Sequence, residues 1–183
     1  MRPMASCRFL TYLTMIATLI LSSSNAIGQT RSLGATFSFT GVSIAYDIQS
    51  GKKDAFLELD LKAECAEFYA GRSEFPGVSA SASWNSYLKK WESDGGTSVA
   101  LFAGPGLTLG YCPDYKRTSG IIFGLEGIVG VECSFKRNVI VSASFAPMIG
   151  SHILIGKESA EMNFYRNGIQ YALIPEIGIR YRF

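Results

Sequence analysis

One group of side chains in the sequence has the composition of a catalytic set. His152 is the only histidine of the chain, and Ser151, Glu158 and Ser159 are close to it in sequence. Serine, histidine and a carboxylate are the groups of an acyl-transfer or hydrolase triad. A single histidine beside common serines has little specificity, however, and a histidine in an outer loop is ordinarily solvated. We therefore predict no catalytic residues and expect that the protein is not an enzyme.

Metal and cofactor sites have little support in the sequence. Beyond residue 28 there are three cysteines, Cys65, Cys112 and Cys133. Their odd number and wide spacing argue against a disulfide framework and against a His/Cys metal site. Residues 104–110 (GPGLTLG) are rich in glycine, but no helix is expected after them, so they lack the context of a phosphate-binding loop. We expect no cofactor and no metal.

Residues 1–28 have the pattern of a secretory signal peptide. Arg2 and Arg8 give a basic start, and residues 9–21 are an uncharged apolar run too short to span a bilayer. Small residues at positions 26 and 28 are spaced as at a cleavage site. Cleavage there would remove both arginines and leave equal numbers of acidic and basic side chains, so we expect no nucleic-acid partner. The remaining residues, 29–183, are predicted to form one domain.

Alternation of apolar and polar residues with a period of two runs through residues 29–183, with little helical periodicity. Residues 57–66 (LELDLKAECA) are an example, with leucines at every second position and charged residues between them. A change of parity near residues 40–41 predicts a turn or bulge there. The pattern predicts eight strands, at 31–39, 42–49, 54–69, 76–91, 97–112, 119–135, 138–151 and 169–183.

Such alternation is compatible with two architectures. In a secreted soluble barrel or sandwich the apolar face is the core, whereas in a membrane barrel the apolar face meets lipid and the polar face lines the interior. Predicted strands of 14 to 16 residues and a polar face rich in glycine and serine favour the membrane barrel, since globular strands are usually about 5–6 residues long. Aromatic residues also gather near strand ends, as in interfacial girdles. They are Tyr46, Trp91, Phe135, Tyr181 and Phe183 at one rim, and Phe68, Tyr69, Tyr111 and Phe123 towards the other.

The connections between the predicted strands are unequal in length. If both termini are periplasmic, the short turns at 49–54, 92–96 and 135–138 fall on one rim. The longer segments 112–120 and 150–168 then fall on the other rim, as outer loops. Short periplasmic turns and longer outer loops are typical of outer-membrane barrels.

The last seven residues, IGIRYRF, resemble the C-terminal sorting strand of Gram-negative outer-membrane proteins. The matching positions are Ile177, Ile179, Tyr181 and Phe183. More loosely, the whole of residues 29–183 resembles the small eight-stranded outer-membrane barrels of the OmpA-transmembrane and OmpX type. The resemblance implies an all-β, eight-stranded antiparallel transmembrane β-barrel of the up-and-down kind, located in the cell outer membrane. It implies outer-membrane lipids or lipopolysaccharide as surroundings, and recognition by the barrel-assembly machinery during biogenesis.

In a barrel of this register a set of charged side chains points inward. The set is Glu58, Asp60, Lys62, Glu64, Glu126, Glu132, Glu176, Arg180 and Arg182. An eight-stranded barrel is just wide enough to be filled by its side chains, and unpaired charges there would be costly. We therefore expect a network of charge pairs that plugs the interior. The alternative is a path for protons or small ions.

Prolines inside predicted strands are the least usual feature. Pro105, Pro147 and Pro175 each remove a hydrogen bond from the ladder. They predict either bulges or a weak seam between the last two strands, through which a lipid tail could pass.

For function, we expect a non-enzymatic structural or surface-interaction role through extracellular loops, with an unknown loop partner. The alternatives are a lipid-handling enzyme, a hydrophobic-ligand conduit or a small pore.

Overall fold

The computed structural model describes residues 29–38, 41–50, 54–64, 77–93, 95–113, 119–136, 138–155, 160–164 and 175–183. These residues form strands and the connections between them. The strands are β1 (Gln29–Ser38), β2 (Gly41–Ser50), β3 (Ala55–Glu64), β4 (Gly77–Ser93), β5 (Thr97–Pro113), β6 (Ser119–Ser134), β7 (Val139–Phe145), β8 (Met148–Ile155), β9 (Ala160–Phe164) and β10 (Glu176–Arg182). Within these ranges no helix is long and apolar enough to cross a membrane.

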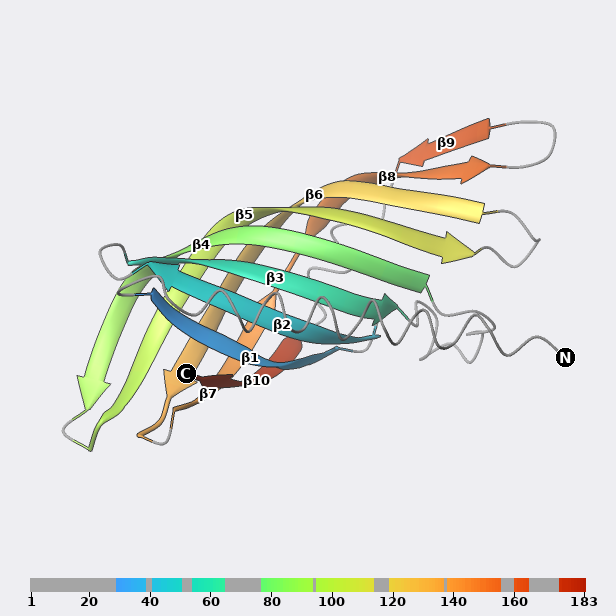
Figure 1. Ribbon diagram of the computed structural model, residues 1–183. Coiled ribbons are helices and arrows are strands. Elements are labelled where there is room, and N and C mark those ends of the chain that lie inside the picture. The colour runs from blue at the N-terminus through green and yellow to red at the C-terminus, as the bar shows by residue number, and fades with distance from the viewer. Residues whose placement is uncertain are drawn as a thin grey trace, which may run out of the picture.

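Eight of the strands close into an antiparallel barrel (Figure 1). Strands β1 to β7 pair with their neighbours in sequence, β7 pairs with β10, and β10 pairs with β1. The closing ladder runs from Phe37 opposite Ile177 to Ser32 opposite Arg182. Beyond it, the Phe183 N–H donates to the Arg31 carbonyl at 2.8 Å. The predicted all-β fold, an eight-stranded antiparallel barrel, is confirmed.

The segment 150–168, predicted to be an outer loop, instead contains strand. β8 pairs with β6 and also with β9, from Ser151 opposite Phe164 to Ile155 opposite Ala160. In Figure 1 these two strands extend beyond β7 and away from β10. Residues 150–168 have no clear period of two, and their glycines, serines and asparagines favour a loop, so the sequence did not indicate these strands.

The prolines do not cause bulges in the ladders that the structure describes. On either side of Pro147, Phe145 lies opposite Val129 and Met148 opposite Glu126, so the register on β6 is unchanged. The Pro147 carbonyl still accepts a hydrogen bond from the Gly127 N–H at 2.9 Å. Pro105 likewise stays within β5 without a change of register. Each proline lacks only the amide hydrogen of one ladder hydrogen bond, and the strand accommodates this loss without an extra residue.

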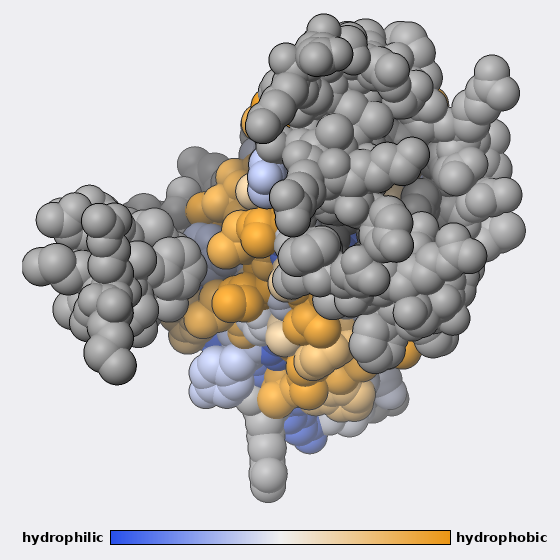
Figure 2. All heavy atoms as spheres, turned by 90° about the vertical axis from the view of Figure 1, so that its right-hand side faces the viewer, coloured by the Kyte–Doolittle hydropathy of each residue, from blue (hydrophilic) through white to orange (hydrophobic). Residues whose placement is uncertain are grey.

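The distribution of side chains is the reverse of that in a water-soluble domain. Leu109 and Leu125 are more than 60% exposed, whereas Arg180 is 3% exposed and Glu132 is 4% exposed. Figure 2 shows hydrophobic residues gathered on the visible outer wall. The interior has only a small apolar cluster, formed by Phe56, Phe102 and Ile128. Most of the interior is therefore polar, and its charged side chains form the candidate site.

Glycines on the inner face leave room for the side chains packed against them. A Cβ added to Gly106 would lie 2.7 Å from the Glu126 side chain, and one added to Gly130 would lie 2.7 Å from Ser144 Cβ. Small barrels alternate small and large inward residues in this way.

The turn before β5 contains Gly96 with a left-handed φ of 75°, and the turn before β7 contains Asn138 with a φ of 61°. Both residue types tolerate that conformation.

Candidate functional site: the charged barrel interior

Arg180 is the centre of the interior. It points inward from β10, and two carboxylates from other strands reach it. Its Nη1 lies 2.7 Å from Asp47 Oδ2 on β2, and its Nη2 lies 2.9 Å from Glu58 Oε2 on β3. Nη2 also donates to Ser142 Oγ at 3.2 Å, and Ser32 Oγ donates to the same Asp47 oxygen at 2.6 Å. One guanidinium therefore binds β10 to β2 and β3 through the interior.

A second ion pair lies closer to the other end of the barrel. Lys62 Nζ on β3 is 3.0 Å from Glu176 Oε1 on β10, and both side chains are partly exposed. Two residues before Lys62, Asp60 accepts a hydrogen bond from Ser43 Oγ at 3.2 Å. β3 and β10 are thus joined at two heights, although β1 and β2 lie between them in the wall.

Three further inward charges are hydrogen-bonded to neutral side chains. The Tyr87 hydroxyl donates to Glu132 Oε1 at 2.8 Å, and Thr108 Oγ1 donates to Glu126 Oε2 at 2.6 Å. Arg182 donates to Ser134 Oγ at 3.2 Å. Not every inward charge is in an ion pair, because hydroxyl groups satisfy some of them. The side chain of Glu64 lies outside the described part of the structure.

Sequence reasoning missed three of these partners, Asp47, Tyr87 and Thr108. Asp47 had a readable signal, since it is on the opposite parity to Val42, Ile44 and Tyr46 and therefore on the inner face. Tyr87 and Thr108 are also inward, but neither residue type by itself predicts a bond to a carboxylate.

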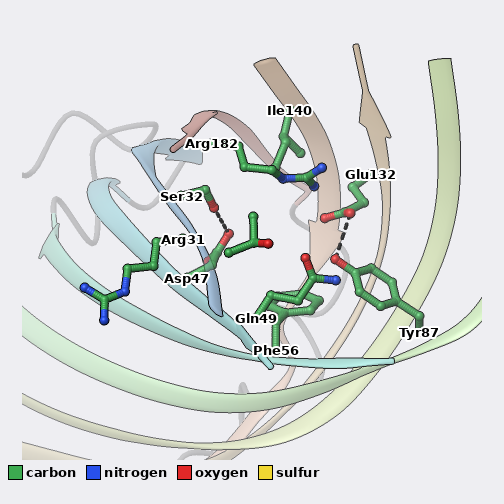
Figure 3. Close-up of a pocket in the computed structure, with 10 residues that line it drawn as sticks. Arg31, Ser32, Asp47, Gln49, Phe56, Tyr87, Glu132, Ile140 and Arg182 are labelled. Carbon is green, nitrogen blue, oxygen red and sulfur yellow. Dashed lines mark hydrogen bonds between the residues drawn. The ribbon is translucent and has the colours of Figure 1, made fainter. Parts of the chain in front are cut away.

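A small polar pocket lies at the end of the barrel where β10 ends (Figure 3). The Tyr87 hydroxyl and Glu132 meet on one side of it, and Asp47 and Ser32 meet on another. Arg182 also lines it. The space is sufficient for about one water molecule. This pocket has no room for an organic substrate, and its groups are suited to holding water or a proton.

The other predicted features have the following positions. His152 lies in β8, opposite Ile122 and Asn163, and not in a loop. The side chains of His152 and Ser151 are outside the described part, as are residues 158 and 159, Cys65 and the Cys112 side chain. Cys133 is a half-buried free thiol. Among the described residues, no three His, Cys, Asp or Glu side chains are grouped to hold a metal ion.

The residues of the expected sorting strand lie on the outer face of β10. Ile177, Ile179, Tyr181 and Phe183 are 53 to 57% exposed. Between them, Gly178 and Arg180 point inward. Residues 1–28, the expected signal peptide, lie outside the described residues.

Comparisons with known proteins find similarity only among solved structures. No protein-family model matches the chain, and no curated protein matches it significantly. Among solved structures, the chain is similar to the crystal structure of a major outer membrane protein from Thermus thermophilus. The two share 12% sequence identity with a TM-score of 0.49, over 85% of this chain and 99% of the other.

Proposed function

We propose that this protein is an integral β-barrel of a bacterial outer membrane, with a non-enzymatic structural or surface-interaction role. The observation that carries the proposal is the apolar belt around the barrel. Every strand of the closed ring contributes large exposed hydrophobic residues, including Leu33 of β1, Ile44 of β2, Leu61 of β3, Val78 of β4, Leu107 of β5, Leu125 of β6, Val141 of β7 and Ile179 of β10. Soluble monomers rarely expose a continuous apolar surface of this kind, whereas lipid requires one.

The backbone and the aromatic residues support the same proposal. A closed ring pairs its own strands, and in lipid the backbone groups must be paired within the protein. Trp91, Phe135, Tyr181 and Phe183 are exposed near the end where β10 ends, while Tyr111 and Phe123 are exposed towards the other end. Two such bands are typical of membrane interfaces.

The interior supports a closed barrel and not a porin. Arg180 and its two carboxylates cross the interior at one height, and Lys62 and Glu176 cross it at another. We infer that the protein acts through surfaces outside this plug. Its expected surroundings are outer-membrane phospholipid and lipopolysaccharide, and the barrel-assembly machinery during biogenesis.

Refolding into vesicles followed by planar-bilayer recording tests this proposal. We expect a folded form that migrates differently in gels before and after boiling, and no steady openings of porin size. A protein that stays in the aqueous phase would contradict the membrane proposal. Steady large openings would contradict the plug and leave the membrane location intact.

A second candidate function is a conduit for a hydrophobic ligand, and one observation favours it. In the ladder of β7 with β10, Glu176 lies opposite Ser144, and in the ladder of β8 with β9, Phe164 lies opposite Ser151. The chain advances seven residues from Ser144 to Ser151 but twelve from Phe164 to Glu176. A continuous antiparallel ladder pairs residues one for one, so the two ladders cannot be parts of one register. The interruption lies beside Pro147, where the predicted seam was expected.

A further inference from the structure

The structure contains one bulge in β4, near the end of the barrel where β10 ends. Tyr87 lies opposite Phe102, but Lys89, and not Leu88, lies opposite the next residue, Leu101. Leu88 is therefore the extra residue, and it is 62% exposed. A bulge of this kind moves the following side chains to the opposite faces of the strand.

The bulge decides which of two adjacent lysines faces outward. Beyond it, Lys89 and Trp91 pair with Leu101 and Val99, which are on the outer face of β5. Lys90 instead pairs with the buried Ala100. Its Nζ lies 2.5 Å from Asp54 Oδ1 and 4.3 Å from the centroid of the Tyr87 ring. Without the extra residue, these faces would be exchanged.

Lys89 and Trp91 form a unit on the outer wall. Lys89 Nζ lies 5.2 Å from the centroid of the indole ring. In the described part of the chain, Lys89 has no carboxylate within ion-pair distance, in contrast to Lys90. Trp91 is 45% exposed and pairs with Val99, and the apolar Leu101 and Val131 lie further along the wall, at the height of Lys89. Lys89 lies at the height of Leu101, and Trp91 lies at that of Val99, one step nearer the turn. The cation and the indole ring therefore meet where the apolar wall ends, as such side chains do at a membrane interface.

We propose that Lys89 and Trp91 bind the headgroup phosphate of an anionic phospholipid. This inference rests on the membrane insertion proposed above. Charge supports the choice of an anionic lipid, because Lys136 of the neighbouring turn is exposed and lies against Gly96. Two of the three short turns expected at this end contain a pair of basic residues in the sequence, at 52–53 and 136–137. A phospholipid is favoured over lipopolysaccharide because this rim is the expected periplasmic one.

Tryptophan fluorescence can test the proposal, because the chain has only two tryptophans, Trp84 and Trp91. The Trp84→Phe variant leaves Trp91 as the single probe. The full chain is refolded into phosphatidylcholine vesicles that contain a minor fraction of acyl-brominated phosphatidylglycerol or brominated phosphatidylcholine. One lysine near an anionic surface favours the anionic lipid by about fivefold, so we expect brominated phosphatidylglycerol to be enriched about fivefold near Trp91.

Two lysine variants in the Trp84→Phe background complete the test. Lys89→Gln is expected to remove the preference, whereas Lys90→Gln is expected to retain it, because Lys90 is bound to Asp54. Equal quenching by both lipids, or equal effects of the two lysine substitutions, would overturn the site. Quenching by neither lipid would instead overturn membrane insertion, so the two failures are distinguishable.

Discussion

Lys62 and Glu176 form an ion pair of 3.0 Å across the barrel interior, although 114 residues separate them in the sequence. They lie on β3 and β10, the same two strands that Glu58 and Arg180 connect. In the wall, β1 and β2 lie between these two strands along the shorter way round the ring. The interior side chains therefore reinforce the closing seam of the barrel from within.

Arg180→Met is expected to destabilise the barrel severely. It would leave Asp47 and Glu58 buried without their cation, and the loss of one partner from a buried ion pair costs about 3–5 kcal/mol. Urea unfolding in vesicles, followed by the mobility shift of the folded form, measures the loss. Asp54→Asn is the matched control, because the Lys90–Asp54 pair is exposed and such pairs contribute about 0–1 kcal/mol. Equal losses in the two variants would contradict the central role of Arg180.

Phe183→Asp is expected to block assembly into the membrane of cells. The substitution places a charge on the outward face shared with Tyr181 and Ile179, while the backbone bond to Arg31 can remain. Phe183→Leu, which keeps an apolar residue at this position, is expected to assemble. The heat-modifiable form in isolated membranes is the measurement. Normal amounts of this form in the Phe183→Asp variant would refute the sorting-strand hypothesis.

The change of register beside Pro147 predicts rapid amide exchange at the seam. Residues 145–149 and 175–177 are expected to exchange faster in micelles than residues 57–61 of β3, which are paired on both sides. Within residues 145–149 the rapid exchange should be restricted to amides that do not face β6, because the β6 side keeps its register. Strong protection across both segments would exclude the seam as a route for a hydrophobic ligand.

Deletion of Leu88 is expected to move the side chains at the end of β4, after the bulge, to the opposite faces of the strand. Trp91 would move inward, and Lys90 and Glu92 would move to the outer wall and lose the contact with Asp54. In the Trp84→Phe background, insertion into lipid vesicles should shift the Trp91 fluorescence to the blue. The deletion of Leu88 should abolish this shift. Leu88→Ala keeps the residue count and should retain the shift. If both variants retain it, the bulge does not determine the orientation of Trp91.

The barrel was predictable because its signal is local. Glu58, Asp60 and Lys62 alternate with leucines, and this pattern alone fixes which face is polar. Neighbouring strands joined by short turns then pair in order, and a shift of one residue would place the charges on the apolar face.

Two parts of the site were not predictable, for physical reasons. The partners of Arg180 depend on how far each strand is shifted along the barrel axis, which no single strand encodes. The bulge at Leu88 depends on the fit of β4 to β5. The opposite parity of Trp91 to Trp84 and Leu88 indicates a change of face in the sequence, but it does not fix which residue is the extra one. Prolines were the expected positions of irregularity. Yet Pro105 keeps its register on both sides and Pro147 keeps its register on β6, since a missing donor does not require an extra residue.

The pairing of β1 with β10 also has a consequence for the order of folding. Every other neighbouring pair in the ring except β7–β10 is a hairpin, whereas Ser32 and Arg182 are brought together from opposite ends of the described chain. Distant contacts carry a larger loop-closure cost and form slowly. The nascent sheet therefore passes through a stage with two free edges, and a free edge is a template for pairing with another molecule. During that interval the chain is most vulnerable to aggregation, and a chaperone that covers β1 or β10 would protect it most effectively.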